Sequence, residues 1–176
     1  VVSVTGNITG GNLHTAGIMS ATSNIQGGNL RTAGLITATG NITGGNILTG
    51  GLLSATGNAT VGNLALNGSY TEGVVAIGTV TTSSTISLSS GTVQTATLTA
   101  STACTFTMPT ATAGKSFMLF LKQAAVTGGG TATFTGVKWN ASGTPIMTAT
   151  AGTMDIFSFT SDGTNWYGTA SQGYTP

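Results

Sequence analysis

The sequence predicts an all-β chain in which a repetitive β-solenoid or intertwined trimeric β-helical shaft precedes a β-sandwich, jelly-roll-like head. Three observations lead to this prediction. The first seventy residues contain four repeats of 17 residues, strand-like runs separated by turn residues follow, and glycine supplies 28 of the 176 residues. Because glycine costs about 1 kcal/mol relative to alanine inside a helix, this density disfavours helices. We assign residues 1–70 to the shaft and residues 71–176 to the head.

The repeats occupy residues 3–19, 20–36, 37–53 and 54–70, and the first reads SVTGNITGGNLHTAGIM. Within it, Ile8, Leu13 and Ile18 are five residues apart, and the next equivalent residue, Ile25, follows after seven. This spacing predicts three short strands per repeat, each with one side chain turned inward. The last repeat has lost part of the pattern, as expected where a repeat array passes into another domain.

Glycine and asparagine recur at fixed positions between these short strands. Both residue types tolerate positive φ, so the columns predict three corners per repeat. The columns are Asn7, Asn24, Asn41 and Asn58; Asn12, Asn29, Asn46 and Asn63; and Gly17, Gly34, Gly51 and Gly68.

Two architectures fit three strands and three corners per repeat. One is a single-chain triangular β-solenoid, and the other is a fibre in which three chains wrap a common axis. Three or four aliphatic side chains per repeat make a thin core for a solenoid that stands alone. We therefore favour the trimer, because threefold association multiplies the buried area and covers exposed strand edges.

In the head, strands are predicted at a spacing of 8–12 residues, which is typical of a sandwich or jelly roll. Asp162 and Gly163 between the last two predict a hairpin. The run 116–121 is apolar on both faces, which predicts a central strand covered by the sandwich or by a neighbouring protomer. The predicted strands are residues 74–81, 85–89, 92–100, 103–108, 115–123, 131–139, 144–148, 153–160 and 164–170.

Composition narrows the classes of partner. Charged residues make up 4% of the chain and the net charge is +1, and the four Lys and Arg residues are scattered, so no nucleic-acid partner is expected. No apolar run approaches the ~20 residues of a membrane span, so no membrane insertion is expected either. The first repeat is already in register at Ser3, without an initiating methionine. We expect an anchoring segment upstream of the given sequence.

Few residues are suited to chemistry. The acids are Glu72, Asp155 and Asp162, and no two share a predicted site, so we predict no catalytic residues and no enzyme. Asp162 is interpreted as a turn residue and Asp155 as a polar residue at a strand edge. One histidine, His14, and one cysteine, Cys104, exclude a closed zinc site within one chain, and no metal or cofactor is predicted.

Two of these residues have structural interpretations. Cys104 alternates with Phe106 and Met108, which indicates a buried packing cysteine. The repeat position of His14 is occupied by Arg31, Leu48 and Ala65 in the following copies, which indicates a variable, outward-facing column.

Several motifs of the head resemble the carboxy-terminal domain of bacteriophage tail-fibre and virion-fibre proteins. They are FTMP at 106–109, SFMLFLKQ at 116–123, VKW at 137–139, DIFSF at 155–159 and DGTNWYG at 162–168. The resemblance covers roughly residues 85–174, and the upstream repeats are similar to the shafts of such fibres. It implies a homotrimeric structural protein of the virion whose distal end contacts the host surface and whose upstream anchoring segment binds other virion proteins.

Four aromatic residues, Trp139, Trp166, Tyr167 and Tyr174, are candidate contacts for a host-surface glycan or protein. Alternatively, the two tryptophans fill the core and the two tyrosines are the exposed pair. Two further functions remain open. One is a capsid- or tail-decorating protein without a receptor role. The other is an ice-binding solenoid, suggested by hydroxyl residues at the start of each repeat, such as Ser20 and Thr22.

Overall fold

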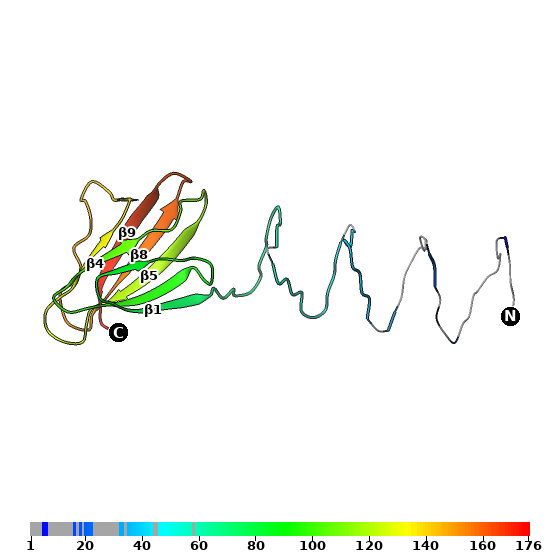
Figure 1. Ribbon diagram of the computed structural model, residues 1–176, viewed down its shortest axis with the longest axis horizontal. Coiled ribbons are helices and arrows are strands. Elements are labelled where there is room, and N and C mark those ends of the chain that lie inside the picture. Colours follow the sequence, from blue (N-terminus) through cyan, green and yellow to red (C-terminus); the bar gives the residue numbers. More distant parts are fainter. Residues whose placement is uncertain are drawn as a thin grey trace. The chain divides into compact units, whose positions relative to one another are not determined.

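The computed structural model describes residues 5–6, 16, 18, 20–22, 32–33, 35–43, 46–57 and 59–176. The chain divides into two units, Val1–Thr60 and Val61–Pro176. The described residues contain nine strands and no helix, and all nine strands belong to the second unit (Figure 1). The all-β prediction is thereby confirmed.

The first six strands alternate between two sheets. From the third strand onward, each of these pairs in parallel with the strand two before it. This is the arrangement of a β-solenoid of about three turns, with each turn contributing one strand to each sheet. The strands are β1 (Val74–Val80), β2 (Ser83–Thr85), β3 (Val93–Leu98), β4 (Ala103–Thr107), β5 (Ser116–Lys122) and β6 (Thr131–Phe134).

The last part of the chain extends the larger sheet. Strand β8 (Met154–Ser161) pairs antiparallel with β5, and β9 (Trp166–Tyr174) pairs antiparallel with β8. The two-residue strand β7 (Val137–Lys138) pairs in parallel with β9, so the order of this sheet is β1-β3-β5-β8-β9-β7. Figure 1 shows β5, β8 and β9 next to one another.

The predicted hairpin at Asp162 is confirmed. The Asp162 Oδ1 atom accepts hydrogen bonds from the backbone N–H groups of Thr164 (2.8 Å) and Asn165 (2.7 Å). Gly163 has φ of +100°, a conformation that L side chains rarely adopt. These features fix the turn between β8 and β9.

The head differs in topology from the predicted jelly roll, because the pairing of β1 to β6 is parallel. The sequence did not reveal the parallel pairing because the coils of the solenoid differ in length. Val74 pairs with Val93, 19 residues along, but Val93 pairs with Met118, 25 residues along. Corners of different lengths leave no fixed period to detect, whereas solenoids with equal coils show one.

Three predicted strands also change. Residues 144–148 contain no strand, residues 131–139 are split into β6 and β7 around Gly136 with φ of +72°, and β2 ends at Thr85. The segment between β7 and β8 is instead a loop held to the sheet by side-chain hydrogen bonds, described below.

The core lies between the two sheets. Alternation in β5 turns Phe117, Leu119 and Leu121 inward, where they are at most 3% exposed. From the facing sheet, Phe106 and Phe134 stack with ring centroids 5.3 Å apart. The other buried apolar residues include Leu98, Phe157, Phe159 and Trp166. Cys104 is 1% exposed and its thiol donates to the Val80 carbonyl at 3.2 Å, which confirms its packing role.

Two buried glutamines hold corners of the solenoid. The Gln123 amide donates to the Gly130 carbonyl and accepts from the Gly130 N–H, both at 2.9 Å. The Gln94 amide donates to the carbonyls of Ser87 (3.1 Å) and Gly91 (2.8 Å). The Gln94 Oε1 atom has no partner among the described residues. The chain passes from one sheet to the other at these corners, where backbone groups have no neighbouring strand to pair with. Each glutamine side chain supplies hydrogen bonds to such backbone groups.

The described residues of the repeat unit contain no strand, and the solenoid that the structure shows lies in the head. Side chains predicted to turn inward are open to solvent: Ile18 is 93% exposed, Leu35 88% and Leu52 89%. Gly51 and Gly68, the described members of the glycine column, have no positive φ, so these two positions lack the conformation expected at a corner. Several predicted positions, including Ile8, Leu13 and His14, lie outside the described residues.

Candidate functional site

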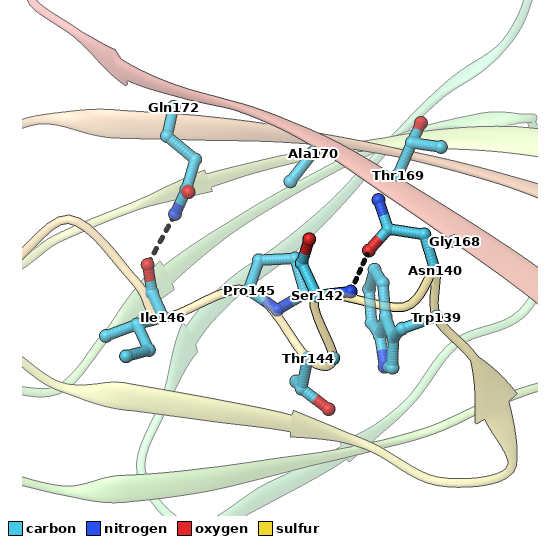
Figure 2. Close-up of a pocket in the computed structure, with 11 residues that line it drawn as sticks. Trp139, Asn140, Ser142, Thr144, Pro145, Ile146, Gly168, Thr169, Ala170 and Gln172 are labelled. Atoms are coloured by element: carbon cyan, nitrogen blue, oxygen red, sulfur yellow. Dashed lines mark hydrogen bonds between the residues drawn. The ribbon is translucent and has the colours of Figure 1, made fainter.

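A cleft of about 430 Å³ lies between the loop that follows β7 and the inner side of β9 (Figure 2). Trp139 and Asn140 lie at one end and Ile146 and Gln172 at the other, with Pro145 between them. The side chains that line the cleft carry hydroxyl, amide and apolar groups, and none is charged.

Trp139 is held by its fit against the backbone of β9. A Cβ atom on Gly168 would lie 2.5 Å from the Trp139 ring, so only glycine allows this approach. On its other sides the indole makes edge contacts with Phe134, Phe157 and Phe159, at centroid distances of 5.8, 6.2 and 6.0 Å. The ring is thus half-buried, with the remainder facing the cleft.

The loop beside Trp139 begins with a local turn. The Asn140 Oδ1 atom accepts a hydrogen bond from the Ser142 N–H at 3.0 Å (Figure 2), and the Asn140 carbonyl accepts one from the Gly143 N–H at 2.9 Å. Gly143 has φ of +82°. An asparagine that accepts from the residue two positions later is a common turn former. The turn places polar groups along the rim of the cleft.

The far end of the loop is attached to β8 and β9 through the Asp155 carboxylate. Both the N–H and the hydroxyl of Thr148 donate to it at 2.8 Å, and the Gly173 N–H donates at 2.9 Å. The Gln172 amide donates to the same carboxylate at 3.1 Å and to the Ile146 carbonyl (Figure 2). Asp155 is 1% exposed, so it is a buried anchor and not the predicted polar residue at a strand edge.

The electrostatics of Asp155 follow from these contacts. Burial raises the pKa of its carboxyl group, but the hydrogen bonds from Thr148, Gly173 and Gln172 stabilise the charged form, and the net pKa lies below the ordinary value of 3.8. The group is therefore ionised at neutral pH, and these hydrogen-bond donors stabilise its charge.

The predicted contact residues are separated by the fold. Trp139 lines the cleft, whereas Trp166 is 3% exposed and donates its indole N–H to the Pro109 carbonyl at 2.7 Å. Trp166 also packs edge-on against Phe117. It is thus a core residue, and its burial leaves it inaccessible to a glycan. Tyr167 and Tyr174 are 48% and 45% exposed, as the alternative interpretation expected.

The two tyrosines lie on the opposite side of the larger sheet from the cleft. Tyr167 pairs across the strands with Thr160, and Tyr174 with Met154, both of which point away from the core. The Tyr167 hydroxyl donates to Asp162 Oδ2 at 3.0 Å. The hydrogen bond to Asp162 raises the pKa of Tyr167, and backbone donors lower the pKa of Asp162 to about 2.

Sequence reasoning missed Asn140, Pro145, Ile146 and Gln172 as cleft residues. They belong to a segment predicted to contain a strand and to the end of the last strand, so no local pattern connected them. Gly168 was an available signal, because an isolated glycine inside a strand often marks a close approach by another group.

Among the described residues, no group of three or more His, Cys, Asp or Glu side chains is placed to hold a metal ion. The described part of the chain also contains no helix long and apolar enough to cross a membrane. Comparison with family models, curated proteins and solved structures found no match.

Proposed function

We propose that this chain is a structural fibre protein of a bacteriophage virion that assembles as a homotrimer through its repeats. The observation that carries the proposal is a set of aliphatic side chains, more than half exposed, that recur with the repeat. Leu35 and Leu52 occupy equivalent positions one repeat apart, as do Ile36 and Leu53. A soluble chain rarely exposes so much apolar surface unless a partner covers it.

The energy available from covering these side chains is large. Burying one such side chain contributes about 1.5–3 kcal/mol, so the set contributes on the order of 20 kcal/mol per chain before ordering costs. The members are Ile18, Leu35, Ile36, Ile42, Ile47, Leu52, Leu53 and Leu64. Association of identical chains would bury these aliphatic side chains against one another, because each copy carries them at the same spacing.

The near absence of charge is consistent with this assembly. With 4% charged residues and a net charge of +1, like chains repel one another little when they come together. Asp155 of β8 anchors a loop, and Asp162 forms the turn between β8 and β9. Both carboxylates therefore have structural tasks. These contacts favour a structural role over a catalytic one.

The cleft beside Trp139 favours a second element of the proposal, attachment to a neutral glycan on the host surface. A partly open indole offers an apolar face for a sugar ring, and the neighbouring Asn140 and Gln172 amides offer donors and acceptors for hydroxyls. Several heads on one particle would convert weak binding into firm attachment. A capsid- or tail-decorating protein would share the assembly and lack this binding.

The assembly is tested with the full chain by light scattering and by gel electrophoresis without boiling. We expect a mass three times that of the chain and an SDS-resistant trimer band. Leu52→Asp is expected to lower the trimer fraction at least tenfold. Leu48→Asp is the matched control, because its column also holds His14 and Arg31 and is predicted to face outward. A monomeric wild-type chain at all concentrations would refute the proposal.

A further inference from the structure

The larger sheet has an apolar side that no described residue covers. We call this side the outer face: the side chains of β1, β3, β5, β8 and β9 that point away from the core. Alternation places Met118 and Phe120 there, opposite the buried Phe117, Leu119 and Leu121. The other apolar members are Val74, Ala76, Val93, Met154, Ile156 and Tyr174.

The register brings these side chains into neighbouring positions. Val74, Val93 and Met118 form one cross-strand row, and Ala76, Thr95, Phe120 and Ile156 form the next. Adjacent residues in such rows are about 4.5–5.5 Å apart, so the apolar groups form one continuous surface. Val74 is 64% exposed and Met118 40%.

The smaller sheet provides an internal comparison. Its own outward positions are hydroxyl residues except for Ala103, namely Ser83, Thr85, Thr105, Thr107, Thr131 and Thr133. A sheet side that meets water is normally polar, as this one is. On the outer face of the larger sheet, hydroxyl residues such as Thr97, Ser158 and Thr160 share the outward positions with the apolar residues named above. The apolar part of this face, centred on β1, β3 and β5, departs from that rule, which indicates that it meets another surface.

Two grooves indent the outer face. One, of about 210 Å³, is bounded by Ala76, Phe120 and Met154. The other, of about 290 Å³, lies beside Met118 and is bounded by Tyr70 and Glu72 of the segment that leads into β1. Tyr70 is 68% exposed. The outer face is therefore continuous with the exposed side chain of Tyr70.

The size of the outer face fits a protein partner. Five strands spaced about 4.8 Å apart, each contributing about six residues at roughly 3.3 Å, give an area on the order of 500 Å². This is more than half of the roughly 800 Å² that each partner buries in a specific interface.

We infer that the outer face of the larger sheet packs against a second copy of this chain, so that the heads as well as the repeats are joined in the fibre. This inference rests on the proposed trimer, which brings identical heads to the end of one shaft. The two charged residues bordering the grooves, Glu72 and Lys122, have opposite signs, so the surface presents no excess of like charge to its copy. The occupant is therefore the same chain and not a nucleic acid or an acidic ligand.

The experiment introduces single thiols into the assembled full chain. It measures how fast each thiol reacts with a maleimide and whether it can be cross-linked to the same thiol of another chain. Met118→Cys places a thiol on the outer face, and Thr133→Cys places one on the outward side of the smaller sheet. The natural Cys104 is buried, so its lack of reaction reports that the head is folded. We expect a bulky maleimide to modify Met118→Cys at least tenfold more slowly than Thr133→Cys. A short bismaleimide should link Met118→Cys chains to one another and leave Thr133→Cys chains unlinked.

A second variant separates misfolding from loss of contact. Ile156→Cys tests the same surface from β8 and should show the same protection. If both outer-face thiols react as fast as Thr133→Cys in a chain that is trimeric by light scattering, the inference is wrong and the proposed trimer stands. If the wild-type chain is monomeric, the proposed function fails, and rapid modification of both thiols would follow.

Discussion

Thr148 donates both its backbone N–H and its hydroxyl to the carboxylate of Asp155, each at 2.8 Å. Thr148 lies in the loop that lines the cleft, whereas Asp155 lies in β8, next to the central strand of the larger sheet. A single buried carboxylate thus connects the candidate binding loop to the rigid part of the fold. Because burial strengthens such bonds and makes their loss costly, the loop depends on this charge.

Asp155→Asn is expected to lower the free energy of unfolding by about 2–3 kcal/mol, because hydrogen bonds to a charged acceptor are lost and a donor replaces one oxygen. The loop between β7 and β8 should become sensitive to proteases before the head unfolds. Urea unfolding and limited proteolysis measure the two effects. Asp162→Asn is the control: its carboxylate is exposed, and a smaller change is expected. Equal losses in both variants would contradict the anchoring role.

Acid should release the same loop. The pKa of Asp155 is depressed in the folded chain, so its contribution to stability is complete above the ordinary pKa of 3.8 and is lost as the pH falls through the lower, folded value. The urea midpoint should therefore decrease below about pH 4. In Asp155→Asn the part of this decrease that belongs to Asp155 should be missing. An identical acid profile in the two proteins would refute the assignment.

Gly168→Ala should displace Trp139. The added Cβ atom would lie 2.5 Å from the indole, which is held on its other sides by three phenylalanines. We expect a loss of about 1–3 kcal/mol, as for other overpacked sites, with a shift in tryptophan fluorescence toward that of exposed indole. Thr169→Ala, at the exposed neighbouring position, should leave both unchanged. A Gly168→Ala chain with wild-type stability and fluorescence would show that the ring has room to move.

Gln123→Leu should be more destabilising than Gln94→Leu. Both glutamines are buried, but Gln123 satisfies the N–H and the carbonyl of Gly130, whereas the Gln94 Oε1 atom is unpaired among the described residues. Leaving two backbone groups unpaired costs about 2–4 kcal/mol in Gln123→Leu. In Gln94→Leu the loss is partly offset because an unpaired buried oxygen is removed. Thermal unfolding of both variants gives the comparison, and the reverse order would count against it.

Glycan binding, if it occurs in the cleft, should depend on Ile146, which is 87% exposed at its rim. Ile146→Glu introduces a charge into a neutral cleft and should reduce binding to a panel of immobilised neutral glycans at least tenfold. Val126→Glu changes an exposed aliphatic residue in a different loop and should have no effect. A wild-type trimer that binds no glycan on the panel would favour the decorating role.

The sequence supplied most strand positions of the head but not their pairing. Apolar alternation at Phe117, Leu119 and Leu121 and the turn at Asp162 are local features, so they were readable. Parallel pairing between Val74, Val93 and Met118 depends on corners of unequal length, which leave no period. The cleft was missed for a related reason: Trp139 and Gln172 are distant in sequence and line the same cleft only because β7 pairs with β9.

The repeats present the opposite case, since their period is plain but the strands it predicts are not formed at the described positions. Leu35 and Leu52 are nearly fully exposed, so the side chains meant to form a core find none within their own chain. A periodic pattern indicates which side chains must be buried together. Whether the partner is the next coil or another chain is a property of the assembly.

The position of β8 between β5 and β9 also determines when the head can form during synthesis. Phe157 and Phe159 of β8 complete the core that the solenoid coils begin, and Phe159 stacks on Phe117 at 4.8 Å. At roughly 5–20 residues per second, the ribosome needs several seconds after β5 to deliver the last strand. The head therefore closes only after the repeats and β9 have been made. Chains that trimerise through their heads would join at that stage, and the repeats, which precede the head in the chain, would come into register afterwards.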